Sequence, residues 1–357
     1  MDKIRKILQG RDGVFLIAEI GKNFIQSADQ RPVSEYLAKA KELIKLAKES
    51  GADAVKFQTH NLDDEQMNIQ VTAPHFSGAD RYSWIKRNTE ATPPEFWQSL
   101  KEYADEVGIL FFTTPMSRGA AQMVNELVSL WKVGSGDILD FVLLDYVAST
   151  KKPIIISTGM STLSEVDLAV DFLKRRQAEF ILLHCVSKYP CPPEDLSLGT
   201  IKFLEKRYGV AVGFSDHSIG SESAVAAVNL EAKVIEKHFS LDRELWGSDH
   251  KVSMTPAEFR VMADLISKGE IANIKDYGDS NKVLQDGEAI FRPLFRKSLV
   301  YGCKLEKGVV LKIDHIYAMR PQKYISGLPS EDYEKVIGRK LKQSVDKYQP
   351  IRLTDFV

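Results

Sequence analysis

PIIIST at residues 153–158 and FILLHC at residues 180–185 are two short, almost continuously apolar runs, separated by a segment with the spacing of an amphipathic helix. Runs of this kind are typical of strands that are covered on both faces, as in parallel sheets. The same alternation of a short apolar run and a longer helical segment continues in both directions, to about residues 14 and 270. The pattern therefore predicts a series of β/α units.

Eight strands are expected in this part of the chain. Their predicted ranges are VFLIAEI (14–20), ADAVKFQ (52–58), GILFFTT (108–114), LWKVGS (130–135), PIIIST (153–158), FILLHC (180–185), VAVGFS (210–215) and AKVIEKHF (232–239). Eight units in about 250 residues match the size of one α/β protein of the (β/α)8, or TIM, barrel type. An open doubly wound sheet is the alternative, but no GxGxxG follows the first strand.

Capping boxes mark the starts of several helices between these strands. In a capping box, a threonine oxygen and a glutamate three residues later satisfy free backbone N–H groups. The predicted pairs are Thr92 with Glu95, Thr162 with Glu165 and Thr255 with Glu258.

The character of the sequence changes after residue 270. Residues 271–285 form a polar stretch with many turn formers and poor periodicity, which is typical of a linker. Short strand-like runs follow: KSLVYG (297–302), GVVLKI (308–313) and IYAMRP (316–321). We therefore expect a catalytic barrel at residues 1–270, a linker at 271–285 and a small, mostly β domain at 286–357.

Composition excludes some classes of partner. The chain has 48 Lys plus Arg and 49 Asp plus Glu, so no overall field would recruit nucleic acid or an anionic membrane. It contains no uncharged apolar run of 18 residues and no apolar segment near the N-terminus. Its three cysteines form no CxxC pair, and an odd number suits a reducing compartment. We expect a cytoplasmic protein.

Polar residues gather at the predicted carboxyl ends of the strands, where a barrel builds its active site. The candidates are Glu19, Lys56, Thr114, Lys132, Ser135, Asp137, Ser157, Ser187, Tyr189, Ser215, His217 and His238. Lys56 and Lys132 interrupt apolar runs, where a free ammonium is costly without an anionic partner. Two interpretations stay open for them: buried ion pairs or snorkelling side chains, or, with the hydroxyls, a cradle for phosphate and carboxylate groups.

Histidines provide a candidate metal site. His217 and His238 follow consecutive strands, so in a closed barrel they are neighbours, and imidazole suits a divalent transition metal. Together with Asp249 they form a candidate site that leaves coordination positions open. Each histidine alone is more often structural. The histidines in polar text, which are His60, His75, His250 and His315, are expected to be solvated or to cap backbone groups.

Several of the quoted segments belong to a recognisable series: AEIGKN, GADAVKFQTH, TTPMS, WKVGSGD, ISTGM, LLHCVSKYPCPPEDLSL, GFSDHS and EKHFSLD. In this order they resemble the sialic acid (N-acetylneuraminate) synthase family, which includes spore coat polysaccharide synthases and other nonulosonic acid synthases. FRKSLVYG, AMRP and a later VIGR are similar to the small antifreeze-like (SAF) domain at that family's C-terminus. The resemblance covers nearly the whole chain, and GFSDHS with EKHF is a specific pair.

The resemblance implies a transferase that condenses phosphoenolpyruvate with an N-acylated aminosugar aldehyde and releases phosphate. It implies a divalent metal, Mn2+ or Mg2+, on His217 and His238. The implied phosphoenolpyruvate site consists of Lys56, Thr114, Lys132, Ser135, Ser157, Ser187 and Ser215. The implied contacts to the sugar or to metal-bound water come from Glu19, Asp137, Tyr189 and Asp249. Family members are domain-swapped homodimers, so the resemblance places Arg320 in the active site of a partner subunit.

Three positions depart from the family's pattern. Asn23 is followed by Phe24, where a histidine is common, Asp137 stands where a glutamate is frequent, and Ser187 stands where sialic acid synthases tend to have asparagine. These departures leave the acceptor sugar undetermined. The alternative functions are a metal-dependent aldolase or sugar isomerase on the same barrel, and a catalytically inactive carbohydrate-binding or assembly protein. Charges at buried strand ends argue against the inactive protein.

Overall fold

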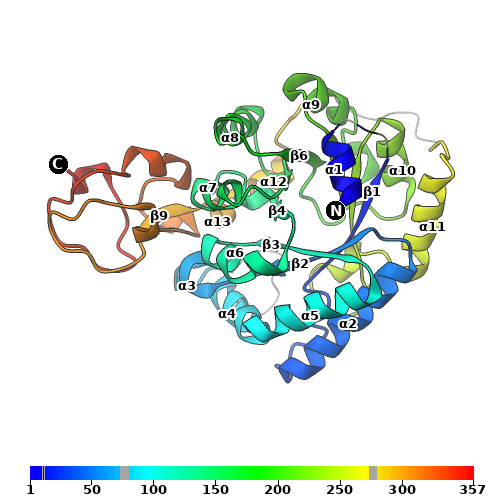
Figure 1. The fold of residues 1–357 in the computed structure, drawn as a ribbon, viewed down its shortest axis with the longest axis horizontal. Helices are drawn as coiled ribbons and strands as arrows, with labels where there is room; N and C mark the ends of the chain where they lie inside the picture. The colour runs from blue at the N-terminus through cyan, green and yellow to red at the C-terminus, as the bar shows by residue number, and fades with distance from the viewer. Residues whose placement is uncertain (10, 12, 73–79, 273–279) are drawn as a thin grey trace.

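The main body of the molecule is a parallel eight-stranded sheet surrounded by helices (Figure 1). The computed structural model describes residues 1–9, 11, 13–72, 80–272 and 280–357. The strands of this sheet are β1 Phe15–Gly21, β2 Ala54–Thr59, β3 Leu110–Pro115, β4 Trp131–Val133, β5 Ile154–Ser157, β6 Phe180–Cys185, β7 Val212–Asp216 and β8 Val234–His238. All eight predicted strands are confirmed, and their ends differ from the predicted ones by at most two residues.

The order of the strands in the sheet shows that it nearly closes on itself. The order is β3-β2-β1-β8-β7-β6-β5-β4, and β3 and β4, which end it, lie next to each other. The sheet is therefore a near-closed (β/α)8 barrel. Its register sets Glu19 of β1 level with Lys56 of β2 on one side and with His238 of β8 on the other. Residues distant in the sequence thus meet at the carboxyl ends of the strands.

The helices pack around this sheet. They are α1 Asp2–Leu8, α2 Val33–Glu49, α3 Leu62–Glu65, α4 Arg81–Ala91, α5 Pro94–Val107, α6 Arg118–Val124, α7 Phe141–Ser149, α8 Leu163–Arg175, α9 Thr200–Tyr208, α10 Glu222–Asn229 and α11 Pro256–Ser267. No helix in the described ranges is long and apolar enough to cross a membrane.

The capping boxes at Thr162 and Thr255 are confirmed, since each threonine and its glutamate form both reciprocal bonds. The one predicted at Thr92 is wrong. Helix α5 begins at Pro94 after Pro93, and two residues without an N–H at this start leave less for a side chain to cap. Thr92 Oγ1 instead donates to Asn88 O at 2.8 Å, at the end of α4.

An aromatic layer fills the space between α5 and the strands β2 and β3. Phe24, in the loop after β1, packs on Phe57 and Phe96 with ring centroids 6.1 and 5.2 Å apart. Phe57 in turn contacts Trp97 and Phe111. Buried aromatic rings contribute much of a core's apolar area. Phe24 therefore anchors the first loop of the barrel mouth in the core.

A small antiparallel unit follows the barrel in the chain and protrudes to its side, at the left of Figure 1. Its two strands, β9 Ser298–Tyr301 and β10 Ile316–Met319, pair with each other. Arg118 of α6 ties this unit to the barrel, because its guanidinium donates to Ile313 O at 2.7 Å and Ile316 O at 2.8 Å. Two short helices, α12 Asp286–Ala289 and α13 Arg292–Phe295, precede the unit. The antifreeze-like assignment and the domain limits stay predictions.

Candidate active site

The two predicted lysines lie inside the barrel and are paired with glutamates. Lys56 Nζ is 2.6 Å from Glu19 Oε2 and 3.6 Å from Glu236 Oε2, and Lys132 Nζ is 3.9 Å from Glu236 Oε1. None of the four side chains is more than 7% exposed. The buried ion pairs that the sequence left as one interpretation are therefore present. Two lysines and two glutamates, one each from β1, β2, β4 and β8, give this cluster no net charge.

Hydroxyl groups complete the lysine–glutamate cluster. Lys56 Nζ donates to Thr114 Oγ1 at 3.1 Å, and Lys132 Nζ donates to Ser157 Oγ at 2.7 Å. Ser215 Oγ donates to Glu236 Oε1 at 3.1 Å. The structure thus brings together Thr114, Ser157 and Ser215, which come from β3, β5 and β7, around the two lysines.

The pKa values of the two glutamates of the cluster are shifted in opposite directions. Burial raises the pKa of Glu19, and pairing with Lys56 offsets only part of that rise. Burial acts in the same direction on Glu236, but Lys132 and Lys56 outweigh it, and the pKa of Glu236 lies below its usual value. Neighbouring carboxyls whose pKa values are driven apart are typical of sites that transfer protons. Of the two carboxylates, Glu19 is therefore the stronger base and the better proton acceptor.

Ser135 and Ser187 approach each other across Gly159, which lies in the loop after β5. A Cβ on Gly159 would lie 2.4 Å from Ser187 Oγ and 2.7 Å from Ser135 Oγ, so only glycine fits. Cys185 Sγ is 3.5 Å from Ser135 Oγ and 3.9 Å from Ser187 Oγ. Since β4, β5 and β6 are neighbours in the sheet, these hydroxyls adjoin the lysine–glutamate cluster.

The two predicted metal ligands lie side by side. The rings of His217 and His238 have centroids 5.5 Å apart. His217 Nδ1 is 2.8 Å from the carbonyl oxygen of Val186, which makes Nδ1 the protonated nitrogen and leaves Nε2 free. Burial lowers the pKa of His238 to about 4, so this ring is neutral at pH 7. The ring of Tyr189 covers His217 at a centroid distance of 4.1 Å, and its side chain is 52% exposed.

The imidazole pair fits a divalent metal as part of a ligand set. A carbonyl bond that fixes the tautomer, as at His217, is the usual support of a metal-bound histidine. Asp249 is half-buried and accepts from Ser248 Oγ at 2.9 Å. Among the residues that the structure describes, no three or more His, Cys, Asp or Glu side chains stand close enough together to hold an ion. Two imidazoles would leave other positions to water and substrate, as an open site requires.

Arg320 lies against Asp137 of its own chain. Its Nη2 forms a hydrogen bond with Asp137 Oδ1, and its side chain is completely buried. Lys297 Nζ lies 3.0 Å from the same carboxylate oxygen and 2.7 Å from Asp140 Oδ2. Burial would raise the pKa of Asp137, but Arg320 and Lys297 hold it below its usual value. A residue predicted to face the sugar is thus bonded to two cations from the C-terminal part of the chain.

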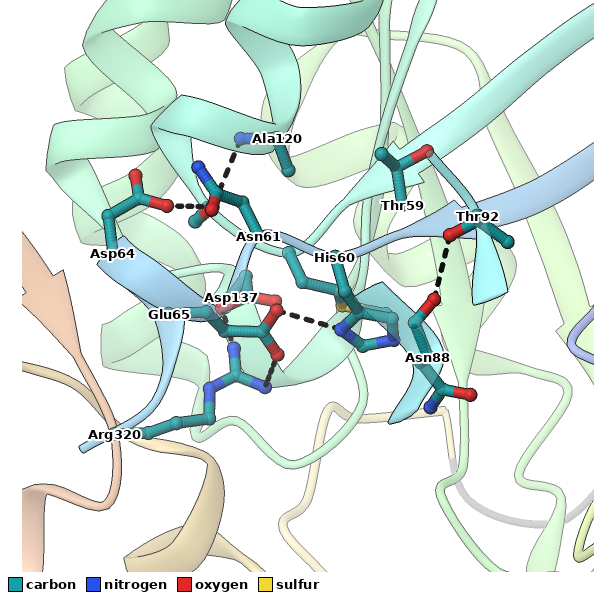
Figure 2. A network of polar contacts seen from close by, with 12 residues as sticks. Thr59, His60, Asn61, Asp64, Glu65, Asn88, Thr92, Ala120, Asp137 and Arg320 are labelled. Carbon is teal, nitrogen blue, oxygen red and sulfur yellow. Dashed lines mark hydrogen bonds and ion pairs between the residues drawn. The ribbon is translucent and has the colours of Figure 1, made fainter. Parts of the chain in front are cut away.

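Figure 2 shows that Arg320 lies between Asp137 and Glu65. Arg320 Nη1 is 4.0 Å from Glu65 Oε1, and His60 Nδ1 is 2.7 Å from Glu65 Oε2. His60 is only 4% exposed, so the prediction of a solvated or capping side chain is wrong there. His250 is fully buried and so not solvated, and it bonds to Ser240 Oγ and to backbone groups, as a capping side chain does. The polar segment around His60 is covered by the segment that carries Arg320. The backbone of Arg320 forms hydrogen bonds with the backbone of Glu65 and of Met67.

The remaining predicted histidines differ. His315 Nδ1 accepts from Lys312 N at 3.3 Å, as a capping side chain does. His75 lies outside the described residues.

Two residues of the site were given no role from the sequence. Glu236 carries a signal, because it lies two residues before His238 in β8 and so points to the same side of the strand. Lys297 carries none, because Asp140, to which it is bonded, lies 157 residues away in the chain.

A polar region without internal partners lies beside this network. Lys22 Nζ and both amide atoms of Asn88 are buried, and in the described part of the chain they have no hydrogen-bond partner. Lys22 Nζ is 5.9 Å from the ring of Phe24 and 5.7 Å from that of Trp97, and burial lowers its pKa to about 7. Buried polar groups without partners are uncommon in folded proteins.

Comparisons with known proteins give this arrangement a context. A family model described as the NeuB family matches residues 43–276. The N,N'-diacetyllegionaminic acid synthase of Legionella pneumophila is 34% identical over 347 residues, which cover 93% of this chain and 91% of that protein. The N-acetylneuraminate-9-phosphate synthase of Homo sapiens is 32% identical over 346 residues, which cover 95% of this chain and 91% of that protein.

A solved structure agrees with both relatives. The spore coat polysaccharide biosynthesis protein spsE from Bacillus subtilis superposes with a TM-score of 0.75 and 30% identity, over 96% of this chain and 95% of that chain. Barrel and relatives together define a synthase of the sugar-acid type. The chain belongs to the NeuB family, and the resemblance found in its motifs is confirmed.

Proposed function

We propose that the protein is a nonulosonic acid synthase, which condenses phosphoenolpyruvate with an N-acylated aminosugar in its aldehyde form and releases phosphate. The observation that carries the proposal is the pair of buried lysines, Lys56 and Lys132, each bonded to a hydroxyl at the carboxyl end of a strand. Buried ammonium groups with hydroxyl donors beside them suit a small substrate that is anionic at two ends. The synthase relatives support the same reaction class.

We assign the anionic ends of phosphoenolpyruvate to one set of side chains. The set is Lys56, Thr114, Lys132, Ser135, Ser157, Ser187 and Ser215. Because both lysines are fixed by their neighbours before substrate enters, they stabilise the charge of the departing phosphate without reorganisation.

In the proposed reaction the C2–C3 double bond of phosphoenolpyruvate supplies the electron pair for a bond between C3 and the aldehyde carbon of the sugar. The carbonyl π bond of the aldehyde breaks, and its oxygen becomes a hydroxyl by taking up a proton from water. Water then adds to C2, and the resulting tetrahedral intermediate breaks its C–O bond to phosphate. Glu19 orients this water and accepts its proton on a carboxylate oxygen, a role that fits its raised pKa. His217 and His238 would hold Mn2+ or Mg2+, and this ion, when bound, supplies the Lewis acidity that makes the aldehyde carbon electrophilic.

The acceptor sugar would face Asp137, Tyr189, Asp249 and Arg320. The two named synthase relatives differ in their products, one a 9-phosphate and the other a diacetylated legionaminic acid. A panel of N-acylated aminosugars, with and without phosphate, is therefore the test. Purified protein with Mn2+, phosphoenolpyruvate and one acceptor should release inorganic phosphate, and Lys132→Ala is the control. If no acceptor supports phosphate release, the proposal fails, whereas turnover of a sugar without phosphoenolpyruvate indicates an aldolase or isomerase.

We also propose that the protein is a domain-swapped homodimer. In a domain swap, two chains exchange an identical element. The contact that Arg320 makes with Asp137 inside one chain would then be made between Arg320 of one chain and Asp137 of the other. Inactive Arg320→Ala and Lys132→Ala chains, unfolded and refolded together in equal amounts, should then regain about a quarter of the wild-type sites, because random pairing makes about half of the dimers mixed. No regained activity means that Arg320 acts within its own chain.

A further inference from the structure

A short helix between the barrel and the C-terminal unit contacts two loops of the barrel mouth through one side chain. Glu288, in α12, is completely buried. Its Oε1 accepts hydrogen bonds from Met160 N and from Ser187 N, both at 2.8 Å. Met160 lies in the loop after β5, and Ser187 lies in the loop after β6. One carboxylate oxygen therefore joins two loops that the chain itself connects through α8 and β6.

These two loops carry groups that the proposed reaction needs. Ser187 Oγ belongs to the assigned anion site, and the residue before it, Val186, accepts the bond that fixes His217. In the other loop, Met160 has φ +53°, an uncommon conformation for a residue with a side chain, and follows the glycine squeezed against Ser187 Oγ. The loops meet so closely that their spacing decides where the Ser187 hydroxyl points.

The helix that carries Glu288 is itself held in place. Glu288 Oε2 accepts from Gln285 N at 3.2 Å, and the side chain of Gln285 donates to Asp195 O. Further along, Arg292 donates to Met160 O at 2.9 Å and to Glu165 Oε2 at 2.7 Å. The segment from Gln285 to Arg292 thus bonds to the loop after β5, to the loop after β6 and to α8.

We propose that Glu288 is a positioning residue for the anion site, and that docking of the segment 285–292 and binding of phosphoenolpyruvate favour each other. The inference rests on the proposed function for the identity of the ligand. Without Glu288 two buried N–H groups lose their acceptor, and the loops are free to separate. Because coupling between two equilibria is reciprocal, substrate that needs the joined loops must also hold the segment against the barrel.

The variants are Glu288→Ala, Glu288→Gln and, as a matched control, Asp286→Ala. Asp286 lies in the same helix, is exposed, and carries the same charge. In Glu288→Gln the amide oxygen still accepts both N–H bonds from the loops, and only the longer bond from Gln285 N is lost with the charge, so this variant separates the loop contacts from the charge. Calorimetric titration of the full-length proteins with phosphoenolpyruvate in Mn2+ should show a Kd raised about tenfold or more for Glu288→Ala. Glu288→Gln and Asp286→Ala should bind much as the wild type does.

Amide hydrogen exchange tests the loops apart from the substrate. In the absence of phosphoenolpyruvate, Met160 and Ser187 should exchange faster in Glu288→Ala than in Asp286→Ala, and phosphoenolpyruvate should slow exchange in residues 285–292 of the wild type. In turnover, the KM for phosphoenolpyruvate should rise in Glu288→Ala while the KM for the acceptor stays unchanged. Unchanged loop exchange, or a wild-type Kd in Glu288→Ala, overturns the inference. A different outcome is that the wild-type protein binds no phosphoenolpyruvate while the loops of Glu288→Ala still exchange faster than those of Asp286→Ala. That outcome overturns the proposed function but supports the contact between Glu288 and the loops.

Discussion

Replacing Lys132 by methionine tests whether the buried lysines hold substrate or only hold the fold. Methionine keeps most of the volume but removes the charge and the bond to Ser157 Oγ. Glu236 is then left with Lys56 at 3.6 Å as its cation. The lysine–glutamate cluster changes from no net charge to one negative charge.

The cost to stability follows from the broken pair. Removing one partner of a buried ion pair costs about 3–5 kcal/mol. At about 2.1 cal/mol/K per residue, the unfolding entropy of 357 residues is about 0.75 kcal/mol/K, so we expect Tm to fall by about 4–7 °C. In the wild type, the lowered pKa of Glu236 contributes stability that is present above about pH 4.5, its ordinary value, and is lost as the pH falls. The deficit of Lys132→Met should therefore be large at pH 7 and shrink only as the pH falls below about 4.5.

The double variant Lys132→Met/Glu236→Gln separates the two roles. It removes both charges, so calorimetry should show that much of the lost Tm returns. Binding of phosphoenolpyruvate should not return, because a charge-assisted hydrogen bond of about 1.5–3 kcal/mol is still missing, which corresponds to a Kd raised roughly 10- to 150-fold. Wild-type affinity in either variant would refute the assignment of Lys132 to the anion site.

Three further results are expected. His217→Ala should abolish metal-stimulated turnover while circular dichroism stays unchanged, and retained activity would remove His217 from the ligands. Lys237→Met should lower Tm as Lys132→Met does, because Lys237 and Asp216 form a fully buried pair at 2.6 Å, yet leave phosphoenolpyruvate affinity unchanged in titration calorimetry. Burial lowers the pKa of His60 to about 4, so His60 contributes about 3 kcal/mol that is fully present above pH 6.5 and is lost as the pH falls toward 4. Urea unfolding of His60→Gln should show a correspondingly smaller loss across that window, and an equal loss would contradict this.

The fold could be predicted because each strand and each helix of the barrel has its own signal in the local sequence. Each strand is a short apolar run that a helical segment follows, and burial on both faces leaves that signal unmistakable in FILLHC. The local patterns failed at Thr92, where two prolines replace free N–H groups, and at GVVLKI (308–313), which forms one isolated bridge at Val310 and no strand.

The site was readable in part for the same reason. Strand ends of a barrel converge, so Lys56, Lys132, His217 and His238 could be grouped from strand order alone. Contacts made by the C-terminal chain could not. Lys297 on Asp140 and Glu288 on the loops of β5 and β6 join segments that no periodicity links, and the burial of His60 follows from Arg320 lying over it.

The neutral pairing of Lys56 and Lys132 with Glu19 and Glu236 bears on which solutes the barrel admits. A monovalent anion such as chloride or acetate would only take the place of one glutamate carboxylate beside a lysine, with the same single negative charge. It would also have to lose its hydration water to enter. An anion with charges at both ends can engage the two lysines at once, and the second contact is made at high effective concentration. Under the proposed function, the barrel would therefore stay empty in ordinary salt and still bind a multivalent anion. The number of negative charges on an anion, and not its shape alone, would then decide whether it binds in the barrel.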